Sequence, residues 1–426
     1  MFNLFPLCLY CILSKTKYLT IAILSYTVTR RQSLRSKNMK LMFIRNRNVL
    51  NTKWLVQYIN ALQKARPDYE ISVVCDTYKK VGNELTFDPK VKLINLSGKT
   101  DNPFINLYHR IRCKITPSCF RHKKLIKQEK PDVIICYFPK DLFNVTMFQR
   151  HNIPIIMMIH GTPQMIVGKY QYEALDENHQ NIRKEILPLR MFHHRCFEQI
   201  TVWQTLLSSF IPMIAKEFSP KKAITIPNMV QQIDPKDYAD LNTEKKKIIY
   251  VARIEPNMKR QHLLAEAFGK VAKDFPDWEV NIWGLHKYPQ YGEEIMNIAR
   301  KYGVEDRVII KGYTTDILSV YKNADIHAFP SKYEGFSLAI ADGQAVGLPT
   351  IGFAQSPSVN EMIIDNHNGL LASDIDDFAN KLAKLMSDKQ LRIELGRNAI
   401  EDVKAYAPDN VIAMWTKLID TTVGEK

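Results

Sequence analysis

The stretch DIHAFPSKYEGFSLAIADGQAVGLPTIGFA, residues 325–354, predicts a strand, a turn, a helix over 336–346 and a second strand. Two strands that are joined through a helix become parallel neighbours in a sheet. The helix then covers one face of that sheet. This stretch therefore predicts an α/β unit with a parallel sheet.

The same alternation of strand-like and helix-like segments continues from Met39 to the end of the chain, which favours α/β architecture throughout. The strands expected in the first half are 40–45, 71–75, 132–136, 154–159, 199–202 and 223–226. In the second half, the segments KKIIYVARI, WEVNIWG and RVIIKGY add strands to the two already described. The helices expected are 51–65, 105–128, 177–196, 258–273, 290–302, 315–323, 336–346, 375–402 and 408–420.

A chain of 426 residues exceeds the size at which one hydrophobic core stops growing, so two domains are expected. They meet near IPNMVQQIDPKDYADLN, 226–242, which is rich in Pro, Asn and Asp as interdomain connections are. We therefore expect two Rossmann-like domains, over 39–228 and 229–407, and a C-terminal helix over 408–426.

Residues 1–38 contain two apolar runs, each too short to span a bilayer. A secretory signal begins with positive charge, whereas no charge precedes Lys15. MKLMFI at Met39 has the composition of a buried first strand. Two interpretations stay open: a leader that touches a membrane, or a start assigned upstream of the true one.

The seven cysteines are odd in number, scattered and absent from the second half of the chain, which indicates a reducing compartment and no structural zinc. Residues 1–240 contain 36 Lys and Arg against 18 Asp and Glu, so the positive charge of the chain lies in its first half. Within it, 109–130 carries eight basic residues against Glu129 alone. Such a segment could lie against anionic phospholipid or nucleic acid phosphate, or be a solvated helix face.

Open parallel sheets bind ligands beyond the carboxyl ends of their strands, so chemistry should concentrate in the turns there. One such turn, ARIEPNMKR, places Arg253 and Lys259 where the chain leaves a strand and enters a helix. Two cations beside free helix amides suit a diphosphate, although a cation pair can also be plain solvated surface. In the turn at 329–338, Gly335 would let the backbone approach a ligand. A Gly-rich phosphate loop is absent from the sequence.

Two acids, Glu334 and Asp342, stand eight positions apart in this stretch. Eight helical residues rise about 12 Å, too far for the two carboxyls to share a proton or to act together on one bond. They could grip the two ends of a long ligand. Alternatively, Glu334 begins the helix, favoured by its dipole, and Asp342 lies on the wet face.

A third turn begins with His160 and Gly161, directly after the predicted strand IPIIMMI. The imidazole could act in a site or simply end the strand. The adjacent glycine permits close approach of the backbone to a ligand, which favours the functional interpretation.

Together VARIEPNMKR, FPSKYEGFSLAIAD, VGLPTIGFAQSPSVNEMIIDNHNGLLA and IHGT resemble family 4 of the retaining nucleotide-sugar glycosyltransferases. The resemblance covers roughly 245–400 well and the first half sparsely. It implies the GT-B fold: two Rossmann-like domains facing each other across a cleft, with C-terminal helices packing back toward the first domain.

The resemblance also implies roles for individual residues. Arg253 and Lys259 match the pair that neutralises the donor diphosphate. Glu334 matches the acid that contacts the donor sugar, and Asp342 takes the position that binds the ribose hydroxyls. His160 matches the histidine that faces the reacting centre from the first domain, beside Gly161. The loop whose backbone borders the sugar and phosphate is matched by Gly335, Phe336, Ser337 and Leu338.

The sequence departs from the family pattern at three places. Asp342 is one methylene shorter than the usual Glu, and Gly343 within a helix costs up to about 1 kcal/mol relative to alanine. The glycine pair usual after the first strand is replaced by RNRNVLNTK, 45–53. We therefore assign no site residue in that loop.

The expected activity is transfer of a sugar from a nucleoside-diphosphate donor to a hydroxyl of a glycan or lipid-linked acceptor, with retention and without a metal or other cofactor. A role in cell-surface polysaccharide or lipopolysaccharide synthesis would place the chain in the cytoplasm, peripheral on the inner face of the cytoplasmic membrane through 109–130. Nucleic acid is not an expected partner. Three alternatives stay open: a degenerate sugar-nucleotide binder, a basic nucleic-acid-binding protein and a sugar-nucleotide epimerase.

Overall fold

The computed structural model describes residues 38–45, 52–75, 86–96, 118–147, 150–163, 194–242, 244 and 246–424. The expected leader, the first half of the basic segment 109–130 and most of the expected helix 177–196 lie outside these residues. So does the RNRNVLNTK loop, apart from its ends.

The first lobe contains a seven-stranded parallel sheet in the order β3-β2-β1-β4-β5-β6-β7. Its strands are β1 (Met39–Arg45), β2 (Tyr69–Cys75), β3 (Lys92–Asn95), β4 (Val133–Cys136), β5 (Ile155–Met158), β6 (Val202–Thr205) and β7 (Ala223–Thr225). Five of the expected strands are confirmed, β3 was not expected, and the strand expected at 199–202 lies three residues later.

The displacement of β6 has a local cause in its polar end. Gln204 and Thr205 are polar, yet both are fully buried in the sheet. The Gln204 amide donates to the Ile226 carbonyl at 2.6 Å, and the Thr205 hydroxyl donates to the Leu207 carbonyl at 3.0 Å. Hydrogen bonds donated by these side chains allow polar residues inside the sheet, which a pattern of apolar residues does not predict.

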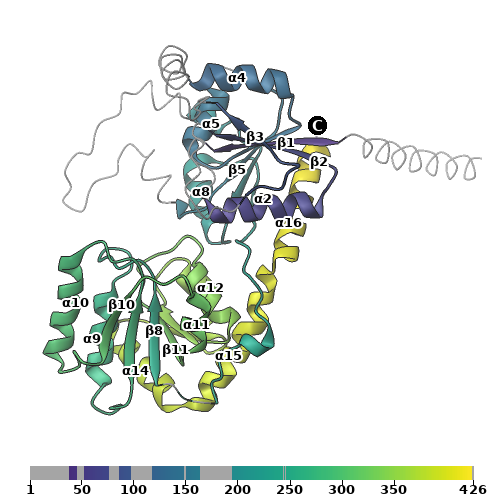
Figure 1. Ribbon diagram of the computed structural model, residues 1–426. Coiled ribbons are helices and arrows are strands. Elements are labelled where there is room, and N and C mark those ends of the chain that lie inside the picture. Colours follow the sequence, from purple (N-terminus) through teal and green to yellow (C-terminus); the bar gives the residue numbers. More distant parts are fainter. Residues whose placement is uncertain are drawn as a thin grey trace, which may run out of the picture.

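Helices cover both faces of this sheet (Figure 1). They are α2 (Lys53–Ala65), α4 (Ser118–Glu129), α5 (Pro139–Thr146), α8 (Phe210–Phe218) and, from the far end of the chain, α16 (Pro408–Gly424). The helices α5 and α8 were not expected. The described cysteines of this lobe are buried: Cys75, Cys119, Cys136 and Cys196.

The second lobe contains a six-stranded parallel sheet in the order β10-β9-β8-β11-β12-β13. Its strands are β8 (Lys247–Val251), β9 (Glu279–Trp283), β10 (Val308–Gly312), β11 (Ile326–Phe329), β12 (Thr350–Phe353) and β13 (Gly369–Ala372). Its helices are α9 (Gln261–Val271), α10 (Pro289–Lys301), α11 (Ile317–Lys322), α12 (Leu338–Ala345), α13 (Val359–Met362), α14 (Ile375–Ser387) and α15 (Lys389–Val403), with 3-10 turns η3 (Pro235–Asp237) and η4 (Lys404–Tyr406).

Both sheets begin with the doubly wound strand order 3-2-1-4-5-6, so the predicted pair of Rossmann-like lobes is confirmed. In such sheets the crevice for ligands opens where the strand order reverses. In the second lobe this switch point lies between β8 and β11, which pair directly. The turns that follow these two strands are those that the sequence singled out.

The chain crosses between the lobes twice, through the connection after β7 and through α16 (Figure 1). The helix α16 packs against α2, with the rings of Trp415 and Tyr58 5.2 Å apart. The Asp420 carboxylate accepts hydrogen bonds from Arg66 at 2.7 Å and from the Tyr69 hydroxyl at 2.8 Å. The expected return of the C-terminal helix to the first domain is therefore confirmed.

Within the described ranges, no helix has both the length and the apolar composition that crossing a bilayer requires.

Candidate functional site

The turn after β8 is held in one conformation by its own side chains. One oxygen of Glu255 accepts the backbone N–H groups of Met258 and Lys259, each at 3.0 Å. The buried Gln261 amide donates to the Arg253 carbonyl at 2.9 Å. At the end of the turn, Arg260 has φ 52°, which lets the chain enter α9 sharply. The turn is thus preorganised rather than loose.

Lys259 and Glu334 form a buried ion pair at the switch point. The Lys259 Nζ lies 2.5 Å from the Glu334 Oε1, and each side chain is 10% exposed. The two residues stand 75 positions apart in the chain. An ammonium carries three N–H donors, so pairing with Glu334 leaves two of them for other acceptors. The pair therefore orients the cation without using up its hydrogen-bonding capacity.

The loop after β11 is tied to the turns after β8 and β12. The Lys332 N–H donates to the Met258 carbonyl at 2.7 Å, and the Tyr250 hydroxyl lies 2.8 Å from the Ser331 hydroxyl. From the turn after β12, the Ser358 hydroxyl donates to the Glu334 carbonyl. These bonds fix the backbone on both sides of Glu334. Glu334 lies in the loop, and α12 begins only at Leu338, so the alternative that Glu334 starts the helix is wrong.

The segment Gly335 to Leu338 presents mainly its backbone. The Phe336 ring is buried and meets the Tyr406 ring edge-on at 5.2 Å. The Ser337 hydroxyl caps α12 by accepting the Ile340 N–H at 3.3 Å. Only Leu338 exposes a large side chain, 40% accessible. The side chains of Phe336 and Ser337 are therefore engaged in packing and capping.

The two lobes meet at a pair of glycines. A Cβ placed on Gly335 would lie 3.2 Å from the Gly161 Cα and 3.6 Å from the His160 carbonyl oxygen. A side chain at position 335 would therefore crowd the backbone of the opposite lobe. The loop of Glu334 and the turn of His160, expected from separate domains, are side by side in the structure.

His160 follows β5, and its ring is clamped by aromatic neighbours. Trp54 stacks on it with ring centroids 3.7 Å apart, and Tyr137 lies at 5.3 Å. Burial lowers the pKa of His160 to about 3, although a hydrogen bond with the Asn228 side chain opposes this shift. The ring is therefore neutral near pH 7, and its Nε2 has no hydrogen-bond partner among the described residues.

Asp342 lies in α12, and burial raises its pKa to about 6. The adjacent Gly343 faces the fully buried ring of His327: a Cβ there would lie 2.9 Å from the His327 Nδ1. The unusual glycine in this helix thus makes room for a core histidine. Asp342 is half-buried, and its carboxylate is not paired with a cation in the described part of the chain.

Arg253 begins the turn after β8, and its side chain is exposed. Among the described residues its guanidinium makes no ion pair or hydrogen bond. The structure therefore brings Lys259, Glu334, Gly335, His160 and Gly161 into direct or adjoining contact. Arg253 lies on the same turn as Lys259, after β8.

Sequence reasoning missed the residues that hold the site together. Tyr250, Ser331 and Ser358 support the loop of Glu334, and Trp54 and Asn228 position His160. Trp54 lies in a helix whose apolar periodicity gave no sign of a site. Ser358 has φ 73°, a conformation that the sequence around it does not predict.

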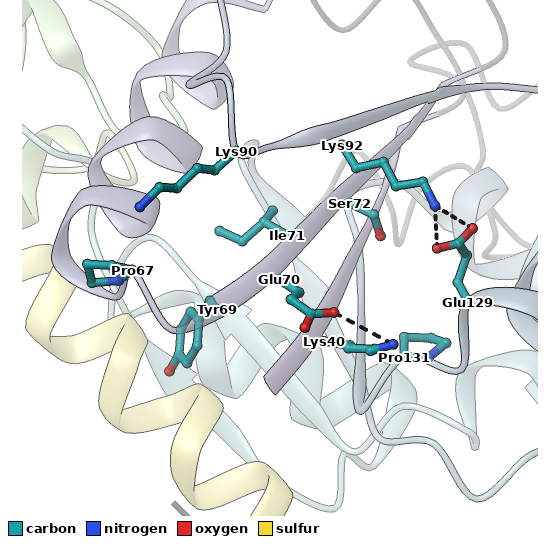
Figure 2. Close-up of a pocket in the computed structure, with 10 residues that line it drawn as sticks. All are labelled: Lys40, Pro67, Tyr69, Glu70, Ile71, Ser72, Lys90, Lys92, Glu129 and Pro131. Carbon is teal, nitrogen blue, oxygen red and sulfur yellow. Dashed lines mark hydrogen bonds and ion pairs between the residues drawn. The ribbon is translucent and has the colours of Figure 1, made fainter. Parts of the chain in front are cut away.

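Two hollows are formed by the described residues, one in the first lobe and one where the two lobes meet. One, of about 440 Å³, lies at the amino ends of β1 and β2 (Figure 2). Of its three cations, Lys40 and Lys92 are paired with Glu70 at 3.6 Å and Glu129 at 2.7 Å, and the third is Lys90. This is the opposite end of the strands from the switch point, so it is not the predicted site.

The second hollow, of about 310 Å³, adjoins the predicted site. It lies between α2, the connection 227–231 and α16, and His160 and Leu338 contribute to its wall. It is thus lined by both lobes.

Residues 234–402 match the family model described as "Glycosyl transferases group 1". The chain is 25% identical over 310 residues to the poly(ribitol-phosphate) alpha-N-acetylglucosaminyltransferase of Staphylococcus aureus, a match that spans 70% of this chain and 57% of that enzyme. This chain spans at most 57% of the length of the first curated relatives that it matches.

Solved structures have the same fold. A glycosyltransferase from Rickettsia africae superposes with a TM-score of 0.68 at 13% identity, over 91% of this chain and all of the other. The Anabaena protein HepE in complex with UDP-glucose gives a TM-score of 0.61 at 15% identity, over 90% of this chain and all of the other. The predicted GT-B fold and the predicted relationship to glycosyltransferases are confirmed, whereas family 4 membership and retention stay predictions.

Proposed function

We propose that this chain, which shares the fold of the GT-B glycosyltransferases, transfers a sugar from a nucleoside-diphosphate donor to a hydroxyl of a glycan or lipid-linked acceptor. One observation carries the proposal: a buried Lys259–Glu334 pair at the switch point of the second sheet, facing the His160–Gly161 turn of the first lobe. Cell-surface polysaccharide or lipopolysaccharide synthesis is the process in which we place this activity.

The difficult step is departure of the nucleoside diphosphate, which develops negative charge. The two N–H donors that Lys259 keeps free are suited to phosphate oxygens, and Arg253 on the same turn adds a second cation. Donors held in place before the reaction stabilise such charge at no reorganisation cost, and removing one typically lowers the rate by about 10²–10³-fold. The rigid turn around Glu255 supports this preorganisation.

Hydroxyl groups of the donor would be held by the acids. Glu334, positioned through its carbonyl by Ser358, is assigned to the donor sugar, and Asp342 to the ribose. Gly335 and Gly161 have no side chain, so the donor could approach the backbone of either lobe. His160 is assigned to the reacting centre as a neutral hydrogen-bonding group, because its lowered pKa makes it a poor proton carrier near pH 7.

We propose retention and metal-independent chemistry on the basis of these cations. The sequence contains one candidate acidic triplet at 374–376, but it is used elsewhere in the structure. The Asp374 side chain accepts the Asp377 N–H at 2.9 Å to cap α14, and Asp376 pairs with Lys270 at 2.7 Å. Unchanged turnover in excess EDTA would support the metal-independent reading.

The direct test is a panel of nucleoside-diphosphate sugars. A donor that binds only the folded state raises the melting temperature, and the sugar and base that do so identify the substrate. Transfer of radiolabel from that donor to membrane glycolipid extracts separates an enzyme from an inactive binder. A chain that no donor stabilises and that shifts nucleic acid in a salt-dependent gel assay would overturn the proposal.

Peripheral membrane association is proposed for the described part of the basic segment, which is α4. Phe120 is 47% exposed on this helix, beside the exposed side chains of Lys124 and Lys127. An apolar side chain among cations suits an anionic membrane surface, such as the inner face of the cytoplasmic membrane. Co-flotation with anionic liposomes, lost when Lys124 and Lys127 are replaced by Gln, is the expected outcome; indifference to lipid charge would contradict it.

A further inference from the structure

The hollow of about 310 Å³ beside His160 has a wall unlike the rest of this protein. None of the described residues that line it is Lys, Arg, Asp or Glu, in a chain of which 24% is charged. A phosphate or carboxylate entering this pocket would meet no opposite charge on the lining residues that the structure describes. The volume lies at the lower end of ligand pockets, which span roughly 300–1,000 Å³.

Aromatic rings form one part of this wall. Trp54, Tyr58 and Trp415 line the pocket from α2 and α16. The Trp54 ring is held by its stack on His160, and the Tyr58 and Trp415 rings support each other at 5.2 Å. Rigid aromatic surfaces provide apolar contact area at low cost in conformational entropy.

Amide side chains form the polar part of the wall. Gln57 comes from α2, and Asn228 and Gln231 come from the connection between the lobes. Each amide offers both donors and an acceptor, so it can match a hydroxyl in either role. Gln57 and Gln231 are exposed, and therefore accessible to a ligand.

Rings with apolar faces and amides that serve hydroxyls together match a neutral sugar. The pocket also adjoins the predicted reaction centre, because His160 and Leu338 line it and Leu338 lies three residues after Gly335. We infer that this pocket binds the neutral saccharide unit of the acceptor, whereas any phosphate or lipid of the acceptor lies outside it. This inference rests on the proposed function and names a substrate class for the same site.

The test compares ligands on the full chain by saturation-transfer NMR. The probes are methyl glycosides of glucose, galactose and N-acetylglucosamine, each against its sugar 1-phosphate. We expect at least one glycoside to bind more tightly than the matching phosphate. The inference is overturned if the phosphates bind as well or better.

Two variants locate the binding. Gln57→Leu and Gln231→Leu each remove amide hydrogen bonds at an exposed position, so we expect saccharide affinity to fall about three- to tenfold. Gln128→Leu, the same change on the exposed face of α4, should leave it unchanged. Saccharide binding that is insensitive to both pocket variants would overturn the inference.

Donor binding separates the two proposals. Gln57→Leu and Gln231→Leu should leave the melting shift produced by the donor unchanged, because the donor residues are elsewhere. If a donor raises the melting temperature but the saccharide binds outside the pocket, this inference is refuted and the proposed function stands. A chain that binds no donor refutes the proposed function.

Discussion

At the scale of single residues, the central feature is the mutual neutralisation of Lys259 and Glu334. Both are buried, and removing one member of such a pair leaves the other charge uncompensated, at about 3–5 kcal/mol. Loss of activity in a single variant would thus mix a stability effect with a catalytic one.

We expect Lys259→Met to lower both stability and kcat/KM, and Lys259→Met combined with Glu334→Gln to recover much of the stability. The kcat/KM of the double variant should stay about 10²–10³-fold below the wild type, because the cation for the leaving group is still missing. Urea unfolding and initial rates measure the two effects, with Lys287→Met on the exposed surface as control. Turnover restored in the double variant would contradict the role of Lys259.

The Asp342 carboxyl makes the stability of the folded chain depend on pH. Its pKa is about 6 in the folded chain, against an ordinary value of 3.8. Because the folded pKa is the higher one, the charged form weakens the fold above about pH 6, and this penalty disappears as the pH falls below about 4. At 1.36 kcal/mol per pKa unit, the penalty is at most about 3 kcal/mol.

Asp342→Asn should therefore raise the melting temperature at pH 8 and have little effect at pH 4. Thermal unfolding across this range measures the difference, and Asp306→Asn on the surface is the matched control. A difference between Asp342→Asn and the wild type that is constant with pH would show that the carboxyl is not buried as described.

At the scale of elements, α12 illustrates how packing overrides helix propensity. Gly343 in its middle is unfavourable by up to about 1 kcal/mol relative to alanine. Added bulk there would instead strike the His327 ring, fully buried in β11 beside Tyr321 at 5.5 Å. Overpacking of this kind costs about 1–3 kcal/mol, so the steric effect wins.

Gly343→Ala is accordingly expected to lower the melting temperature by roughly 2–10 °C. In a His327→Ala background, the same change should be neutral or stabilising, because the obstructing ring is gone and helix propensity then dominates. Calorimetry of the four proteins gives the sign. A Gly343→Ala effect that is equal in both backgrounds would mean that His327 is not the obstacle.

Elements also show where prediction from the sequence stopped. The strand β3, KLIN, has four residues at a sheet edge and two polar side chains, and β13 begins with glycine. Neither has the apolar run or alternation by which longer strands are recognised. The helices α5 and α8 are similarly short, and their positions are set by the strands they connect.

At the scale of the whole molecule, Glu361 of α13 links the lobes. Its Oε1 accepts the N–H and hydroxyl of Ser208, each at 2.7 Å, and its Oε2 accepts the Ser209 N–H at 3.2 Å. A carboxylate from the second lobe thus caps the start of α8 in the first. Burial raises the pKa of Glu361, but the hydrogen bonds from Ser209 and Ser208 outweigh it and leave the pKa below 4.5.

Because the pKa is lowered in the folded chain, this contact stabilises the interface above about pH 4.5 and is lost as the pH falls through the folded pKa. Glu361→Ala should open the lobes at neutral pH and increase the radius of gyration in small-angle scattering. The surface variant Glu401→Ala should leave it unchanged. Identical scattering from Glu361→Ala and the wild type would show that other contacts hold the lobes together.

The sequence by itself determined the two parallel α/β lobes and the turns that carry Lys259, Glu334 and His160. Periodicity, strand ends and glycine positions are local features, so they can be recognised without knowing the fold. The resemblance to glycosyltransferases rested on these same turns.

Only the tertiary structure decided which of these turns meet. The Lys259–Glu334 pair joins residues 75 positions apart, and the contact of Gly335 with Gly161 joins two lobes. The low pKa of His160, the raised pKa of Asp342 and the uncharged pocket at the crossing of α2 and α16 also depend on burial by distant segments. Burial and long-range contact are properties of the folded chain, and no local pattern encodes them.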